Sequence, residues 1–285
     1  MSHWLVFGSS AVTWGCARTL LKLGETVGMV IGLPAALRPL NSVGWLSPCC
    51  PYLEVDDLND PQLIRDLTQR DADYVLSLWP KKLSAAALTI PRRFVIGTHP
   101  TALPLGRGRH PLHWLVAMGQ SRSVMSFFRM TEALDAGPLL CQVPFRWKAQ
   151  GTITDANHAM ECAAMIGVCQ LVRGFRRYPL PVGRPQDETA ATTWRARTLQ
   201  DVTIDPRMSV HAVIQLVRSF APPYPCAKLD VRGVMVDIVE ASREARRTPV
   251  GTTPGMMLAI EAGVVWLRVA DGVVRLRLKL SQACS

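Results

Sequence analysis

The chain has 285 residues, which is enough for one large domain or two. Hydrophobic residues make up 48% and charged residues 19%, so the sequence can form a substantial core and extended disorder is excluded. The net charge of +10 comes from scattered Lys and Arg, which favours an anionic ligand without selecting nucleic acid. No apolar run reaches the roughly 20 residues of a membrane helix, so no membrane partner is expected.

The N-terminal residues MSHWLVFGSS lack the basic region of a signal peptide, so we expect a cytoplasmic protein. The eight cysteines contain no C-x-x-C pair, and no histidine stands at ligand spacing from them. We therefore expect reduced thiols and no metal site.

The first elements indicate a parallel sheet. An apolar strand at 4–7 ends at Gly8, a helical pattern continues to Gly24, and a second buried strand follows at 26–31. This βαβ opening predicts an α/β fold: a Rossmann-like, mostly parallel sheet with helices on both faces. The first turn lacks G-x-G-x-x-G, so a bound dinucleotide is not expected.

The alternation of strands and helices continues for most of the chain. The next expected elements are a Pro- and Gly-rich loop at 32–53, a helix at 61–69, strands at 73–78 and 94–98, a helix at 110–118, strands at 124–130 and 139–145, and a helix at 154–175.

The composition changes after this last helix. Pro, Arg and small polar residues dominate 176–199, as is typical of a linker. A helix at 209–220 follows, and then short alternating strands with hairpin turns at Arg232 and Asp271. The expected organisation is an α/β domain over 1–178, a linker over 179–200, and a small β-rich, barrel-like subdomain over 201–285.

The stretch GTHPTALPLGRGRHPLHW carries the candidate chemistry. His99 follows the fourth expected strand, and ligands of open parallel sheets bind at the carboxyl ends of the strands. Arg107 stands between two glycines, where a guanidinium can reach an anion. Asp135 lies in a later loop after another strand. A lone histidine at a strand end is more often structural, and Asp135 could simply start a turn.

Two consecutive motifs give these residues a context. The runs H-P-x-x-L-P-x-x-R-G-x-x-P-x-x-W and F-F-x-M-x-E-x-x-D-x-G-x-x-L resemble the formyltransferases that use 10-formyltetrahydrofolate. The matching residues are His99, Pro100, Leu103, Pro104, Arg107, Gly108, Pro111, Trp114, Phe127, Phe128, Met130, Glu132, Asp135, Gly137 and Leu140. The segment VRSFAPPYPCAKLDVRG resembles the C-terminal subdomain of the longer members, with Cys226 in place of the usual Gly.

The resemblance implies a one-carbon transferase that moves a formyl group to a primary amine. His99 is then the group that stabilises the developing oxyanion, and Asp135 orients His99 and takes up the amine proton. The family's third member is an Asn two residues before the His, and this position is Gly97. Gly97 has no side-chain donor, so three alternatives remain: the role is reassigned, the enzyme is slower, or the chain is a non-catalytic folate- or sugar-binding relative.

The resemblance also implies binding residues. SLWPKKLSAAAL resembles the segment that lines the family's pterin pocket, although a plain strand-to-helix turn with solvated lysines is the alternative. The expected folate-binding residues are Trp79, Pro80, Lys81, Lys82, Leu83 and Met125. The acceptor is expected at Gly97, Thr101, Arg107, Gly108 and Arg109. His110 and His113 are expected on the surface of the helix that follows.

The family formylates initiator methionyl-tRNA, amino sugars and a hydroxylated ornithine. The tRNA enzymes carry a basic insertion after the second strand, whereas 32–51 here contains one Arg and no Lys. The stretch SFFRMTEALDAG resembles the sugar N-formyltransferases of surface-polysaccharide pathways. We therefore expect an amino sugar as acceptor, either nucleotide-linked or a polysaccharide precursor, with methionyl-tRNA as the alternative; a homodimer is left open.

Overall fold

The computed structural model describes residues 1–34, 50–178, 182–246 and 248–279. Their contacts divide the chain into two compact units, each of which gathers separate stretches of sequence. Unit 1 comprises Met1–Gly108, Arg122–Phe145 and His158–Trp194, and unit 2 comprises Arg109–Ser121, Arg146–Asn157 and Arg195–Ser285. Most of the stretch 32–51, used above to argue against tRNA, lies outside the described residues.

Unit 1 is built on a seven-stranded sheet with the order β3-β2-β1-β4-β5-β7-β8. The strands are β1 (His3–Phe7), β2 (Thr26–Gly32), β3 (Tyr52–Glu54), β4 (Tyr74–Ser77), β5 (Phe94–His99), β7 (Arg122–Arg129) and β8 (Leu139–Arg146). Neighbours from β3 to β5 pair in parallel, and β7 pairs with β5 in the antiparallel sense. The short β3 lies where the sequence indicated only loop.

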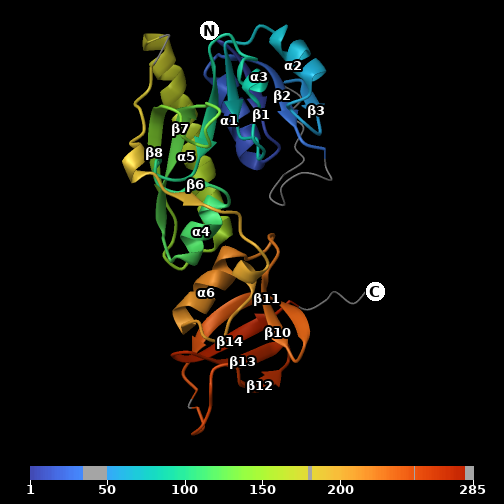
Figure 1. Cartoon of the computed structure of the whole chain (residues 1–285), viewed down its shortest axis with the longest axis vertical. Coiled ribbons are helices and arrows are strands. Elements are labelled where there is room, and N and C mark those ends of the chain that lie inside the picture. Colours follow the sequence, from blue (N-terminus) through green and yellow to red (C-terminus); the bar gives the residue numbers. More distant parts are fainter. Residues whose placement is uncertain (35–49, 179–181, 247, 280–285) are drawn as a thin grey trace. The chain divides into compact units, whose positions relative to one another are not determined.

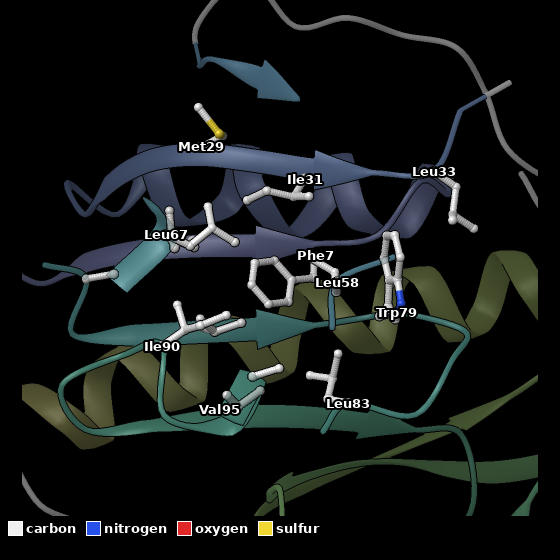
Figure 2. Close-up of a cluster of buried hydrophobic side chains, with 14 residues drawn as sticks. Phe7, Met29, Ile31, Leu33, Leu58, Leu67, Trp79, Leu83, Ile90 and Val95 are labelled. Atoms are coloured by element: carbon white, nitrogen blue, oxygen red, sulfur yellow. The ribbon is translucent and has the colours of Figure 1, made fainter. Parts of the chain in front are cut away.

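Helices cover both faces of this sheet (Figure 1). They are α1 (Ala11–Lys22), α2 (Pro61–Thr68), α3 (Ala85–Leu88) and α5 (Ile153–Arg177). Alternation along β1 explains the two layers, because neighbouring side chains of a strand point to opposite faces. Phe7 packs with Leu67 of α2 and Ala87 of α3, and Figure 2 shows this cluster on one face of the strands. Trp4 instead stacks on Phe175 of α5, with ring centroids 6.0 Å apart. The predicted mostly parallel, two-faced α/β fold is confirmed.

The stretch predicted as a linker is partly held within unit 1. Its strand β9 (Thr193–Trp194) pairs in parallel with β6 (Arg107–Gly108). The backbone of Arg184 also exchanges hydrogen bonds with that of Leu139 at 2.7 and 2.8 Å. Segment 182–194 therefore lies against the loop that follows His99.

Unit 2 contains a five-stranded antiparallel sheet with the order β10-β11-β14-β13-β12. The strands are β10 (Ala227–Val231), β11 (Val234–Glu244), β12 (Met257–Glu261), β13 (Val264–Val269) and β14 (Gly272–Leu278). Helix α6 (Val210–Ser219) packs on the sheet, with Val213 and Leu216 in the same core as Val265 and Leu276. The predicted C-terminal β-rich unit and both hairpins are present. Helix α4 (Pro111–Ala117) also belongs to this unit and packs against α6.

None of the helices in the described part of the chain is long and apolar enough to cross a membrane.

Candidate active site

His99 is the last residue of β5 and is only 5% exposed. Its Nε2 lies 2.7 Å from the carbonyl oxygen of Gly106. Because a carbonyl can only accept, this contact assigns the proton to Nε2. The other ring nitrogen, Nδ1, faces Asp135 at 3.6 Å from Oδ2. The ring thus donates to a backbone carbonyl on one side and faces a carboxylate on the other.

Asp135 lies in the loop between β7 and β8, and its φ of 51° is in the left-handed region. Its Oδ2 accepts a hydrogen bond from the backbone N–H of Gly108 at 2.9 Å. The two loops that the sequence singled out therefore meet, although β7 runs antiparallel to β5 and ends beside Ile96. The separation from His99 Nδ1 is slightly longer than a direct hydrogen bond.

The loop after His99 is fixed by side-chain hydroxyl groups. Thr101 is 3% exposed and its Oγ1 donates to the carbonyl of Leu105 at 2.7 Å. Ser126 Oγ, from β7, donates to the Thr101 carbonyl at 2.6 Å, and the N–H of Gly106 donates to Thr192 Oγ1 at 2.8 Å. The geometry gives Thr101 a role in shaping the loop.

Arg107 was expected to meet the acceptor, but its guanidinium is 8% exposed and already bonded. Its Nη atoms donate to both carboxylate oxygens of Glu188 at 2.7 and 2.8 Å and to Gln186 Oε1 at 2.9 Å. The hydrogen bond to Glu188 raises the pKa of Arg107 above its usual value. Arg107 therefore fixes the loop from inside, whereas Arg109 is exposed and belongs to unit 2. Sequence reasoning missed Gln186 and Glu188, because no motif around them indicates that they bond to Arg107.

Gly97 pairs with Ser77 on one side and Phe128 on the other. A Cβ atom at this position would lie 2.6 Å from Phe128 Cζ and 2.8 Å from Met130 Cγ. Phe128 is 2% exposed and has little freedom to move. The space next to Gly97 is thus filled by the aromatic ring and the Met side chain, so the departure from the family's Asn is part of the local packing.

The expected folate segment begins just past β4. Trp79 and Leu83 lie in the apolar cluster of Figure 2 with Phe7, and Trp79 is 9% exposed. Trp79 Nε1 is buried and has no hydrogen-bond partner in the described chain. A buried N–H without an acceptor costs free energy, so this donor fits a ring ligand that carries an acceptor atom. Pro80, Lys81 and Lys82 are exposed, and Met125 is buried in β7.

The two other histidines near the motif lie in unit 2 and differ from each other. His110 is exposed at the start of α4, as expected. His113 is not a surface group: its Nδ1 lies 2.7 Å from the carbonyl of Ser219, and its ring contacts Phe220 and Tyr224 at centroid distances of 4.8 and 4.7 Å. Burial lowers the pKa of His113 to about 4. The surface expectation is wrong for His113 because the end of α6 and the turn after it cover α4.

Among the described residues, no group of three or more His, Cys, Asp or Glu side chains is arranged to hold a metal ion.

The chain thus combines an open α/β sheet, which in this class of fold binds ligands at the carboxyl ends of its strands, with a separate antiparallel unit. The formyl transferase family matches residues 41–171, and its C-terminal domain family matches residues 198–284. Together the two matches cover more than half of the chain. The chain belongs to the formyltransferase family, whose members are formyl-transferring enzymes.

Individual relatives differ in the molecule they use. Methionyl-tRNA formyltransferase from Chloroflexus aggregans is 27% identical over 228 residues, which is 79% of this chain and 72% of that protein. The N-formyltransferase from Helicobacter canadensis, solved with folinic acid and dTDP-3-aminofucose, superimposes with a TM-score of 0.67 at 12% identity and covers 98% of this chain and 100% of that one. HypX from Aquifex aeolicus, solved with tetrahydrofolic acid, gives a TM-score of 0.70 at 16% identity and covers 96% of this chain. This chain spans only 43% of the HypX chain.

Proposed function

We propose that this protein is an N-formyltransferase that moves the formyl group of 10-formyltetrahydrofolate to the primary amine of an amino sugar. The observation that carries the proposal is the His99–Asp135 pair, joined at 3.6 Å at the carboxyl edge of the sheet in a chain of this family. His99 ends a parallel strand, and open sheets of this class bind ligands at the carboxyl ends of such strands.

His99 and Asp135 have complementary tasks in this reaction. His99 supplies an N–H to the formyl oxygen, where negative charge develops as the amine attacks. To do so, Nε2–H exchanges its bond to the Gly106 carbonyl for one to the formyl oxygen. Asp135 lies on the opposite side of the ring and accepts the proton released by the amine, directly or through a water molecule. A proton then passes to the nitrogen that carried the formyl group, and tetrahydrofolate leaves.

The co-substrate belongs with the segment around Trp79. When bound, it supplies an activated one-carbon unit at the formyl oxidation level. Trp79 would give its unpaired Nε1–H to the pterin, and the backbone from Pro80 to Leu83 would complete that side of the pocket. Lys81 Nζ donates to the carbonyl of Asp56 at 3.0 Å, which holds this turn to the neighbouring loop.

Gly97 has no side chain that could donate to the formyl oxygen. Other donors must therefore stabilise the negative charge that develops there. The packing of Phe128 and Met130 against Gly97 supports a reassigned role, because the missing amide has been replaced by an ordered apolar wall. His99 is a buried donor two residues from Gly97, so in our proposal it carries the larger share of oxyanion stabilisation.

The acceptor is proposed as an amino sugar linked to a nucleotide, or a polysaccharide precursor. The relative from Helicobacter canadensis, solved with a nucleotide-linked amino sugar, supports this choice through its fold. The net charge of +10 fits a diphosphate linkage. Methionyl-tRNA is the second candidate, since the relative from Chloroflexus aggregans uses it and the same charge fits a polyanion.

One assay separates these alternatives. The protein is incubated with 10-formyltetrahydrofolate and either a panel of amino-sugar nucleotides or charged initiator tRNA, and tetrahydrofolate release is followed. We expect release that depends on an amino-sugar nucleotide and is lost in His99→Ala. A several-fold preference for the charged tRNA would overturn the choice of acceptor. Folate binding without release for any acceptor would favour the non-catalytic relative.

A further inference from the structure

Gln186, in segment 182–194, contacts both loops that carry the His99–Asp135 pair. Its Nε2 donates to the carbonyl oxygens of Asp135 and Gly137, each at 2.8 Å. Its Oε1 accepts from Nη2 of Arg107 at 2.9 Å. A single carboxamide therefore joins the loop after β7 to the loop after β5.

These hydrogen bonds form a closed ring. Arg107 precedes Gly108, whose N–H donates to Oδ2 of Asp135 at 2.9 Å. The path from the Asp135 carbonyl through Gln186, Arg107 and Gly108 returns to the Asp135 carboxylate. Because the ring holds both the backbone and the side chain of Asp135, it fixes the direction of the carboxylate as well as the place of the loop.

The backbone of Asp135 also benefits from such support. Its φ of 51° lies in the left-handed region, which Asp adopts more readily than most residues but at a cost relative to Gly. A strained backbone persists only where its surroundings over-determine it. The two bonds from Gln186, to the carbonyls of Asp135 and Gly137, restrain the peptide groups that follow these two residues.

The orientation of the Gln186 amide is determined by its partners. Arg107 is always charged and only donates, so it must face Oε1. The two carbonyls only accept, so they must face the NH2 group. A glutamate at this position has the same shape and no donor for the carbonyls, which makes Gln186→Glu a specific probe of these bonds.

We propose that Gln186 is a positioning residue that holds Asp135 at the angle from which its carboxylate serves His99 and the reacting amine. This inference rests on the proposed function.

The test compares Gln186→Glu with the wild type and with Asp187→Ala as a matched control. Asp187 is adjacent, and its carboxylate bonds Thr189 within its own turn. We expect Gln186→Glu to lower kcat on the order of 10- to 100-fold, since small displacements of a reacting group have this effect, with KM for the formyl donor within about twofold. We expect Asp187→Ala to retain kcat.

A second measurement separates positioning from a general structural role. If Gln186 acts through Asp135, then Gln186→Glu causes no further loss in an Asp135→Asn background. If the two losses multiply, or if Gln186→Glu keeps more than half of kcat, the inference is overturned.

Amide hydrogen exchange provides a readout independent of activity. Gln186→Glu should speed exchange of the Gly108 amide, which donates to Asp135, and leave the amides of β1 and β4 unchanged. If the wild-type protein transfers no formyl group to any acceptor, the proposed function fails, and this exchange measurement alone decides the inference. Unchanged exchange at Gly108 would then overturn it.

Discussion

Two histidines of this protein, one in each unit, lie against backbone carbonyls. The charged neighbour of His99 is a carboxylate, whereas that of His113 is a guanidinium. His99 has Gly106 on one nitrogen and the carboxylate of Asp135 on the other. His113 Nδ1 contacts the carbonyl of Ser219. Arg197 donates to the backbone carbonyl of His113 at 3.1 Å. A carboxylate can orient an imidazole and exchange protons with it, whereas a guanidinium cannot accept a proton. Burial alone therefore does not distinguish the two histidines. The chemistry of the neighbouring charged group does.

The surroundings of His113 suit a packing role. The guanidinium of Arg197 lies over the rings of Trp114 and Phe220, 4.6 and 4.7 Å from their centroids. Burial lowers the pKa of this guanidinium to about 10, against its usual 12.5. His113, Trp114 and Phe220 thus form part of a cation–aromatic cluster that joins α4 to the end of α6.

The largest expected effect separates the two histidines by activity. His99→Ala or Asp135→Asn should lower kcat on the order of 10²- to 10⁴-fold, the usual scale for a positioned proton-transfer group. The double variant should be little worse than the worse single variant, because the pair acts as a unit. His113→Gln should retain the wild-type kcat under conditions in which the variant is folded. The comparison breaks if His99→Asn retains more than about half of the wild-type rate of tetrahydrofolate release.

The strand that presents His99 gives a second test. Gly97→Asn should destabilise the protein by about 1–3 kcal/mol and reduce kcat, because the new side chain must displace Phe128 and Met130. Gly174→Ala is the matched control, since a Cβ there meets no atom within 4 Å. Denaturant unfolding and steady-state rates measure both variants. A more active Gly97→Asn enzyme would show instead that the oxyanion site is incomplete.

The pH dependence of stability tests whether His113 is buried in its neutral form. The folded state keeps His113 neutral down to its pKa of about 4, whereas the unfolded chain protonates near 6.5. Unfolding therefore takes up a proton between these values, and stability falls as the pH drops from 6.5 towards 4, by up to about 3 kcal/mol. Urea unfolding at pH 7 and pH 4.5 should show a smaller loss in His113→Gln. The exposed His211→Gln is the control and should behave as wild type.

The smallest effect concerns Trp79. Trp79→Phe removes the buried N–H that lacks a partner but also shrinks a packed core side chain, so the two effects oppose each other and stability should change little. If the indole donates to the co-substrate, KM for the formyl donor should rise about two- to tenfold, the value of one neutral hydrogen bond. Unchanged KM would remove Trp79 Nε1 from the folate site. Trp14→Phe, in the first helix, controls for the loss of an indole.

Local patterns predicted much of the fold. The alternation along β1 and the helix signals gave the parallel sheet, and the hairpin turns gave the antiparallel unit. His99 and Asp135 were found through a motif of fixed spacing. Their contact distance depends on how β5 and β7 pair, which no local pattern contains.

What the sequence could not indicate depends on distant partners. Arg107 between glycines is suited to bind an anion until Glu188 is found on its guanidinium. His113 is an ordinary helix residue until Phe220 covers it. Gly97 is a departure from the family until Phe128 is seen in the space beside it. In each case the decisive neighbour comes from another element, so only the folded structure supplies it.

The pairing of β6 with β9 has a consequence for the order of events during synthesis. Gly106 and Thr192, which bond across this pair, are separated by 86 positions. At about 5–20 residues per second, the ribosome delivers the second partner ~4–17 s after the first. For that interval the nascent chain has the strand bearing His99 without the segment that secures the following loop. Assembly of the site is therefore one of the last events in the folding of unit 1. Slow translation across 182–194 would prolong the period in which the loop after His99 is unsecured and accessible to a chaperone or protease.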